Sequence, residues 1–325
     1  MSVSSPVIAA SSVSSPTPSR ALRTYAWAVV AYNVLVILWG TAVRATGSGN
    51  GCGDHWPLCN GSVFEHHPAV ATIIEYTHRA TSLVDLLAVA GLVVWVYRGT
   101  GRRHLARVAA VVSLILILDE ALLGAGLVLL GMTANNQSVA RAVYLALHLT
   151  NTLLMLGAMA VTAHLLGRKR GYMRGSVELR SLGLTITAVV AVLLTGATGS
   201  LTALTDTLHP ATSLKAAFLQ DFSAHSNWML RLRWVHPAAA ILAGAFVVAL
   251  IVLGMRHASH RRLAVTVAAL LLIQYALGVA DLTLLTPLSM QILHLLGADL
   301  LWIALIVLAA RLSITPIGCA AKSCA

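Results

Sequence analysis

The sequence predicts an all-α integral membrane protein whose eight transmembrane helices form two pseudo-symmetric four-helix bundles. Of the 325 residues, 58% are hydrophobic and only 10% are charged, whereas a soluble domain carries about 25% charged residues. The apolar residues form long runs, such as 108–118 and 241–253, which are typical of membrane-spanning helices. In addition, matching residues recur in the two halves of the chain. These observations exclude a soluble globule, a disordered chain and a disulfide-rich scaffold.

Eight segments are long and apolar enough to cross the hydrocarbon layer, which takes about 20 residues. We expect the spans at residues 24–44, 72–97, 108–131, 142–166, 181–201, 234–254, 263–285 and 290–310. The alternating segments of about 10 residues that mark a transmembrane β-barrel do not occur in the sequence. Helices are therefore predicted throughout.

The spans divide the chain into two halves with short connections and tails. We expect a flexible cytoplasmic tail at 1–23, an N-terminal half at 24–166, a cytoplasmic linker at 167–180, a C-terminal half at 181–310 and a second cytoplasmic tail at 311–325. The first segment lacks the basic stretch followed by an apolar run that marks a signal peptide. We therefore interpret it as a tail that stays on the chain.

The basic residues predict the orientation in the membrane. The chain has a net charge of +11, and 16 of its 22 basic residues fall on one side of the predicted spans, with Glu178 as the acidic residue that joins them. An excess of Lys and Arg marks the cytoplasmic side. Both termini are therefore expected inside, with the bacterial plasma membrane as the expected location. Because topology accounts for these charges, a nucleic-acid partner is excluded.

Two sets of four helices can be laid over one another. The matches are Leu123–Ala125 with Leu277–Val279, Ala45–Ser48 with Ala197–Ser200, His78 with His236, and His148 with His294. An even number of spans per unit preserves its orientation, so the pattern predicts a parallel repeat. Each half then carries a histidine in its second and in its fourth helix.

The four histidines are expected at similar depth, within roughly 10 Å of the outer boundary at a rise of 1.5 Å per residue. Two imidazoles on neighbouring helices of a bundle can bind one haem iron from opposite faces. The metal ligands predicted on this basis are His78, His148, His236 and His294. A single intramembrane histidine can equally be a hydrogen-bonded packing residue, but four at matched positions favour two haem sites.

Charged residues accompany these histidines. Glu75 lies three residues before His78, on the same helix face, and an ionisable group inside a span costs about 2.5–3.5 kcal/mol, which marks it as a functional candidate. The alternative is an internal ion pair with Arg79. The second half has Arg233 at the equivalent position, an asymmetry that favours one reactive site and one electron-transfer site.

Six basic residues fall outside the predicted cytoplasmic segments: Arg44, Arg79, Arg141, Lys215, Arg231 and Arg233. Arginine pairs with carboxylates in bidentate fashion. We therefore expect some of these arginines, Arg79 and Arg233 first, to bind haem propionates. Plain anchoring at the membrane interface is the alternative.

The first outer loop is rich in glycine and contains Cys52 and Cys59. Their spacing is not one that zinc sites use, and disulfides persist on the oxidising side of the membrane. We expect a disulfide over the first histidine pair, with two free thiols as the alternative; whether such a bridge is structural or redox-active stays open. No role is assigned to Cys319 and Cys324, or to the outer segment 202–230.

This combination resembles the haem A synthase family of cytochrome oxidase assembly. The residues that carry the resemblance are the loop with Cys52, Trp56-Pro57-Leu58 and Cys59, then Glu75-Tyr-Thr-His78-Arg79, His148-Leu-Thr-Asn151, His236 and His294. The resemblance covers about residues 24–310. Its members have eight spans in two halves and oxidise the C8 methyl of haem O to a formyl group by successive hydroxylations.

The resemblance implies a role for each matched residue. His78 and His148 would flank the substrate haem O, with Glu75 beside the methyl group; these three are the predicted catalytic residues. His236 and His294 would bind a haem b cofactor, and the two loop cysteines match the family's disulfide pair. The implied partners are haem O, a haem O synthase, a membrane electron carrier and the lipid bilayer.

Two other functions fit part of the pattern. A di-haem b-type cytochrome for electron transfer would use the same four histidines, but it explains neither Glu75 nor the cysteine loop. A transporter built from repeats would require broken helices at the midplane, whereas the polar residues cluster near the outer face. The sequence does not identify the electron acceptor, the source of the formyl oxygen or the oligomeric state.

Overall fold

A computed structural model describes residues 18–62, 68–133, 136–168 and 179–313. The described chain is helical, and eight of its helical segments are long and apolar enough to span a membrane. The predicted all-α membrane fold is therefore confirmed, and the chain is a multi-pass membrane protein. The helices in chain order are α1 (Arg20–Ala45), η1 (Ser48–Asn50), α2 (Val70–Gly99), α3 (Ala106–Leu129), α4 (Val139–Leu166), α5 (Leu179–Leu208), α6 (Leu214–Phe222), α7 (Trp228–Leu232), α8 (Val235–Met255), α9 (Arg261–Thr283) and α10 (Leu288–Ser313).

Several helices begin at a polar cap placed just before the apolar run. The Ser19 hydroxyl accepts a hydrogen bond from the Leu22 amide, and Ser138 and Ser213 cap α4 and α6 in the same way. Such caps satisfy amide groups that a helix leaves unpaired at its first turn. They also explain why these helices start where the sequence changes from polar to apolar.

The segment after the fifth predicted span differs from the expectation. We expected that span to end at 201, but α5 continues to Leu208, and α6 and α7 follow before α8. The helix α7 runs into α8 to form one span candidate, Trp228–Met255. The outer segment 202–230 is thus mostly helical, because its serine, threonine and lysine residues lower its hydropathy without breaking the helices.

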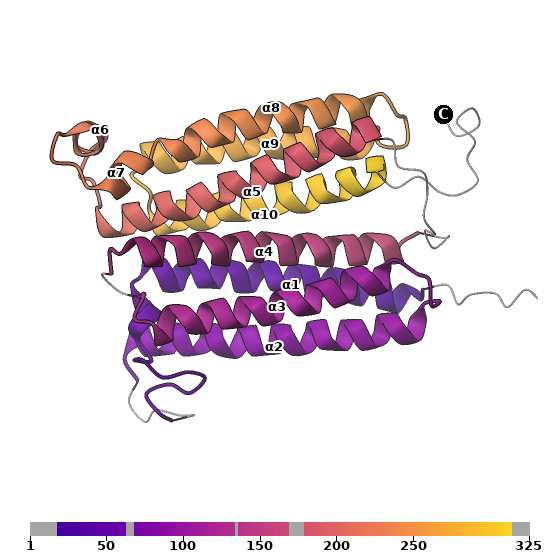
Figure 1. Cartoon of the computed structure of the whole chain (residues 1–325), viewed down its shortest axis with the longest axis horizontal. Coiled ribbons are helices and arrows are strands. Elements are labelled where there is room, and N and C mark those ends of the chain that lie inside the picture. Colours follow the sequence, from indigo (N-terminus) through magenta and orange to yellow (C-terminus); the bar gives the residue numbers. More distant parts are fainter. Residues whose placement is uncertain (1–17, 63–67, 134–135, 169–178, 314–325) are drawn as a thin grey trace, which may run out of the picture.

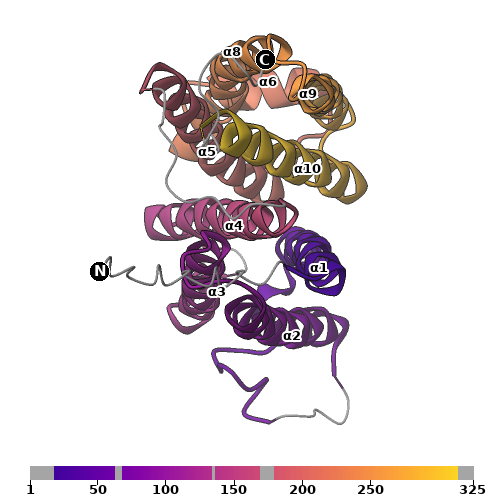
Figure 2. The ribbon, with the colours of Figure 1, turned by 90° about the vertical axis from the view of Figure 1, so that its right-hand side faces the viewer.

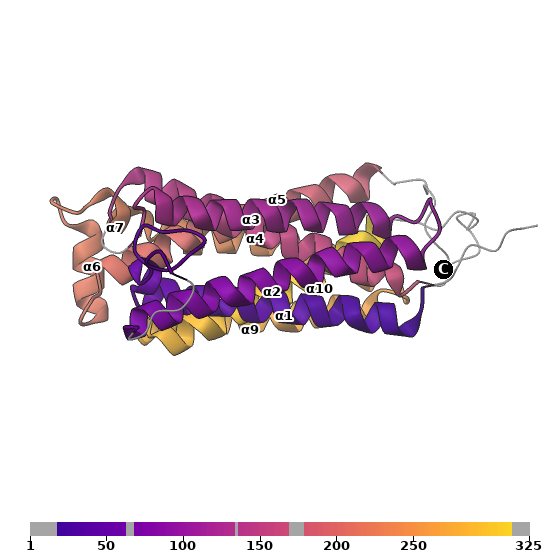
Figure 3. The same ribbon diagram turned by 90° about the horizontal axis from the view of Figure 1, so that it is seen from below.

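The helices lie in two groups side by side. Figure 1 shows α1–α4 together and α5, α8, α9 and α10 above them, with α4 next to α5 and α10. In the view turned by 90°, α4 is the helix of the first group that faces α5 and α10 of the second group (Figure 2). The loop after α1 lies at one end of the molecule together with α6 and α7 (Figure 3). We call this the loop end.

One apolar core joins the two groups. Its buried residues come from all eight spans, and Trp302 of α10 is among the largest fully buried side chains. The Trp302 indole donates a 2.6 Å hydrogen bond to the Leu153 carbonyl on α4, and Gly157 leaves room for the ring. The predicted division at 167–180 therefore separates two groups of helices that share one core.

Candidate functional site

The four predicted histidines lie at comparable positions near the loop end. His78, His148, His236 and His294 lie on α2, α4, α8 and α10, which all begin at that end (Figure 1). Counted from the start of the corresponding spans at Val70, Val139, Trp228 and Leu288, they lie about 9–14 Å inside. The structure thus places all four imidazoles in one layer of the molecule.

The imidazoles are brought together in pairs. The rings of His236 and His294 have centres 6.4 Å apart and planes at 89°. Two imidazoles that bind one metal from opposite sides, through bonds of about 2 Å, have ring centres about 6 Å apart. His78 and His148 lie on α2 and α4 of the first group. Each half therefore supplies two imidazoles from two helices.

Each histidine packs against a glycine of the preceding helix. A methyl group built on Gly40, Gly124, Gly199 and Gly278 would lie 3.1, 3.8, 3.0 and 3.1 Å from the imidazole of His78, His148, His236 and His294, respectively. Three of these distances are shorter than an ordinary contact. Glycine is therefore what lets the imidazoles approach the neighbouring backbone.

This pairing corrects one match of the sequence repeat. We matched Gly47 with Gly199, but Gly47 follows α1 with φ +67, and a methyl group at that residue would have nothing within 4 Å. Gly199 lies inside α5 against His236, as Gly40 lies inside α1 against His78. The structural counterpart of Gly199 is Gly40, whereas Gly47 supplies a left-handed turn that favours glycine.

The second partner of each imidazole differs. The Nδ1 atom of His78 is buried without a hydrogen-bond partner among the described residues. His236 Nδ1 lies 3.1 Å from the Thr195 carbonyl oxygen. The Gln274 amide nitrogen lies 3.3 Å from both ring nitrogens of His294. His148 Nδ1 is likewise buried without a hydrogen-bond partner among the described residues, and it lies 3.4 Å from the carboxylate of Glu120.

Glu75 joins the first outer loop to α2. One of its carboxylate oxygens accepts a 2.8 Å hydrogen bond from the Cys52 amide, and the other pairs with Arg79 at 2.5 Å. The side chain is 3% exposed. The ion pair that was the alternative interpretation of Glu75 therefore exists, and it fixes a carboxylate one helical turn from His78.

The disulfide between Cys52 and Cys59 is present, with Cα atoms 4.4 Å apart. Arg79 holds the same loop, because its guanidinium donates 2.8 Å hydrogen bonds to the carbonyl oxygens of His55 and Leu58. The predicted bridge is confirmed. The loop is thus closed covalently and fixed above the N-terminal end of α2.

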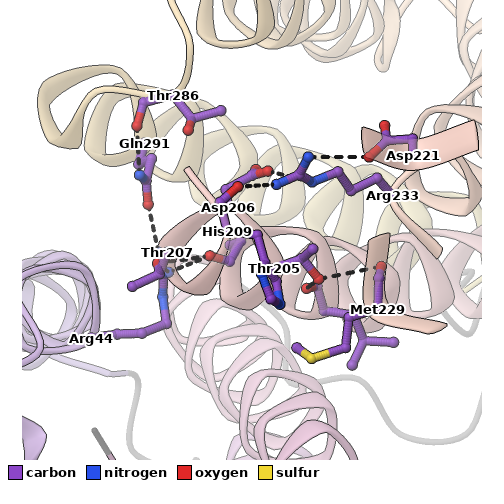
Figure 4. A network of polar contacts seen from close by, with 12 residues as sticks. Arg44, Thr205, Asp206, Thr207, His209, Asp221, Met229, Arg233, Thr286 and Gln291 are labelled. Atoms are coloured by element: carbon purple, nitrogen blue, oxygen red, sulfur yellow. Dashed lines mark hydrogen bonds and ion pairs between the residues drawn. The ribbon is translucent and has the colours of Figure 1, made fainter. Parts of the chain in front are cut away.

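Arg233 lies in a second polar network at the loop end. Its guanidinium pairs with Asp206 at 2.9 Å and with Asp221 at 3.1 Å, and it donates to the His209 carbonyl oxygen at 2.7 Å; Figure 4 shows these contacts. Burial raises the pKa of Asp221, which lies outside the spans, while Arg233 opposes that shift. The contacts found for Arg79 and Arg233 are thus to protein acceptors, whereas we expected propionates.

Arg44 connects the two groups of helices in the same network. It donates to the Ala203 carbonyl and the Thr207 hydroxyl of α5, both at 2.7 Å, and to Gln291 of α10 at 2.6 Å. A buried arginine of α1 therefore ties the first half to the second above the histidine layer.

Sequence reasoning missed Glu120. It is an acidic residue inside α3, and Asn151 of α4 donates a 2.7 Å hydrogen bond to it. Its position relative to Gln274 is the repeat offset of 154 that also relates Gly124 to Gly278, so the repeat could have revealed it. Other buried polar residues that we missed are Asn33 and Asp85, which form a hydrogen bond, and Asp299.

Cys319 and Cys324, to which we assigned no role, lie outside the described residues. Within the described ranges, no cluster of three or more His, Cys, Asp or Glu side chains is arranged to hold a metal ion.

The fold and the site define a class: a multi-pass membrane protein of eight spans with two histidine pairs near one face. Residues 23–306 match the COX15-CtaA family, which is described as cytochrome oxidase assembly protein. Because the match covers most of the chain, the protein belongs to this family, and the resemblance found in the sequence is confirmed.

Named relatives fall into two groups. A protein of Thermus thermophilus named protoheme IX farnesyltransferase is 43% identical over 303 residues, which are 90% of this chain and 48% of the relative. The chain thus spans about half the length of that relative. A heme A synthase of Bacillus licheniformis is 29% identical over 239 residues, 70% of this chain and 74% of the relative. A heme A synthase of Alkalihalophilus pseudofirmus is 40% identical over 100 residues, 31% of this chain and 34% of the relative.

Proposed function

We propose that the protein is a haem A synthase, an oxidoreductase that converts the C8 methyl group of haem O to a formyl group by successive hydroxylations. The observation that carries this proposal is the layer of two histidine pairs, each imidazole backed by a glycine, in a member of this family. His78 and His148 bind the substrate haem in the first half. His236 and His294 bind haem b in the second half.

The residues fit such a group. The ring spacing of 6.4 Å in the second pair suits ligation from both faces of a porphyrin, and the glycines leave the adjoining backbone bare. In the first pair, a buried His78 nitrogen is without a hydrogen-bond partner among the described residues. The iron supplies the oxidising chemistry that an unactivated methyl group requires; the protein positions it and moves protons.

Glu75 is the proposed catalytic carboxylate. It is buried one turn from His78 and held from two sides by the Cys52 amide and Arg79, so its position is set before substrate arrives. A carboxylate so placed stabilises positive charge that develops on the methyl carbon, or accepts a proton that leaves it. The disulfide loop serves by holding Glu75 in place.

The substrate carries a farnesyl chain, and the lipid bilayer is its proposed route of entry. A groove of about 430 Å³ lies between α3 and α4, on the helix that carries His148. Leucines make up much of its lining, and the polar residues Asp119, Thr150 and Asn151 border it. An isoprenoid chain in this groove would keep apolar contacts while the macrocycle lies between the histidines.

We further propose two partners and an orientation. The name of the Thermus relative, protoheme IX farnesyltransferase, describes the farnesylation of haem, and about half of that protein matches this chain. This favours a haem O synthase as a partner that hands over the substrate. A membrane electron carrier accepts the electrons. The basic segments support an orientation with both termini in the cytoplasm, in which the histidine layer faces outward.

The proposal is tested by producing the full chain together with a source of haem O and separating the extracted haems by chromatography. The wild type and a Lys215→Gln variant, which alters an exposed basic residue of α6, should yield haem A. Glu75→Gln should yield none. A wild type that binds haem b but forms no haem A, with haem O available, would instead indicate a di-haem cytochrome.

A further inference from the structure

We propose that Glu120 is a positioning residue that makes the iron of the first site a different centre from the iron of the second. Its carboxylate is the partner of His148 and makes that imidazole a stronger electron donor than the imidazoles of the second pair. The inference rests on the proposed function only in that both histidine pairs bind haem.

Glu120 lies on α3, and side chains of α4, the helix that carries His148, hold its carboxylate in place. One oxygen accepts a 2.7 Å hydrogen bond from the Asn151 side chain, which also donates to the Leu116 carbonyl at 2.8 Å. The other oxygen contacts the Thr152 hydroxyl and lies 3.4 Å from His148 Nδ1. His148 Nδ1 makes no hydrogen bond to Glu120 in this arrangement, so the ring has to rotate to form one.

The second half has the neutral counterpart of Glu120. Gln274 lies four residues before Gly278, as Glu120 lies four residues before Gly124, and each glycine adjoins the histidine of the next helix. The Gln274 amide nitrogen lies 3.3 Å from the His294 ring nitrogens. The two positions thus carry side chains of the same length and shape that differ by one negative charge.

The charge has a defined effect on a metal-bound imidazole. A carboxylate that accepts a hydrogen bond from the Nδ1–H group raises the basicity of the ring. The ring then donates more electron density to the metal. Stronger donation stabilises the oxidised iron and lowers its reduction potential. The other described partners are neutral, namely the Thr195 carbonyl for His236 and the Gln274 amide for His294. We therefore expect the iron of the first site to have a lower reduction potential than the iron of the second site.

A reciprocal exchange tests this inference by potentiometric titration of the haem-loaded full chain. In Glu120→Gln, the ratio of reduced to oxidised iron at the first site, at a fixed potential, should rise by about tenfold, because a charged partner of the ligand becomes neutral; the second site should not change. In Gln274→Glu, the ratio at the second site should fall by a similar factor. Each haem is assigned by its loss from His78→Ala or His236→Ala protein.

Two controls separate this role from general electrostatics or damage to the fold. Lys215→Gln removes an exposed charge of α6 and should leave both ratios unchanged, whereas Glu120→Asp should keep the ratio near that of the wild type. A Glu120→Gln shift matched by Lys215→Gln, or equal at both sites, overturns the inference, as does no shift at all. If Glu120→Gln fails to fold, Gln274→Glu decides alone. A wild type without bound haem defeats the proposed function instead.

Discussion

The two histidine pairs are built alike and surrounded differently. In both halves an imidazole packs on a glycine of the preceding helix at similar depth. Around the first pair lie two carboxylates, Glu75 and Glu120, and a disulfide-closed loop. Around the second pair lie a carbonyl and an amide, Thr195 and Gln274. Under the proposed function, the two pairs keep the same kind of ligand, while the charge near the imidazoles differs between them.

Removing a proposed haem ligand should have the largest effect on haem content and haem A formation. We expect His78→Ala to lose the haem of the first site and at least 100-fold of haem A formation, because outer partners alone are worth 10–100-fold and a direct ligand is worth more. His236→Ala should lose haem b and keep the first site loaded. Haem content per chain, measured on purified protein, checks both. Equal loss of both haems in either variant would mean that the sites are not separate.

Filling the space beside an imidazole should have the next largest effect. Gly199→Val brings a branched side chain against His236, where even a methyl group would lie 3.0 Å away, so we expect most of the haem b to be lost while the first site stays loaded. Gly40→Val should do the reverse. Gly183→Val is the matched control, because nothing lies within 4 Å of that position in the same helix α5. Full haem content in both test variants would contradict the packing argument.

Opening the loop should affect the first site alone. Replacing Cys52 and Cys59 by serine removes a bridge worth about 2–4 kcal/mol, which loosens the Cys52 amide that donates to Glu75. We expect about a tenfold loss of haem A formation and unchanged haem b, measured by chromatography of extracted haems. The pair Cys319→Ser and Cys324→Ser serves as control. Haem A formation at the wild-type level would show that the closed loop is not needed to position Glu75.

The smallest effect concerns pH and the outer network of the second half. Burial raises the pKa of Asp221 above its ordinary value of 3.8, so its contribution to stability is greatest when it is protonated and falls as pH rises through the raised pKa. Asp221→Asn should therefore gain stability relative to the wild type as the pH rises from acid to neutral, as measured by thermal unfolding. A relative loss over that range would show that the ion pair with Arg233 outweighs burial.

The sequence predicted the spans and the disulfide because both depend on local information. Apolar runs locate helices whatever their neighbours, and two cysteines in one short loop are close enough to reach each other. The partners of Arg44 lie 163 and 247 residues away in the chain, and no local pattern indicates them. The helical segment after Thr202 was missed because its polar residues resemble those of a loop.

Glu120 was missed for a different reason. Its meaning depends on the comparison with Gln274, and the repeat offset that relates them was used only for the glycines. The partners of Arg233 were also beyond the sequence: Asp206 and Asp221 come from α5 and α6, and their approach follows from how those helices fold back at the loop end.

The most direct test of the account is the identity and number of haems bound by the purified full chain after production with a haem O source. Two haems per chain are expected, one of them haem b that depends on His236 and His294, the other haem O or haem A that depends on His78 and His148. Colourless protein after mild extraction, or one haem that depends on all four histidines, would contradict the central claim of two distinct sites.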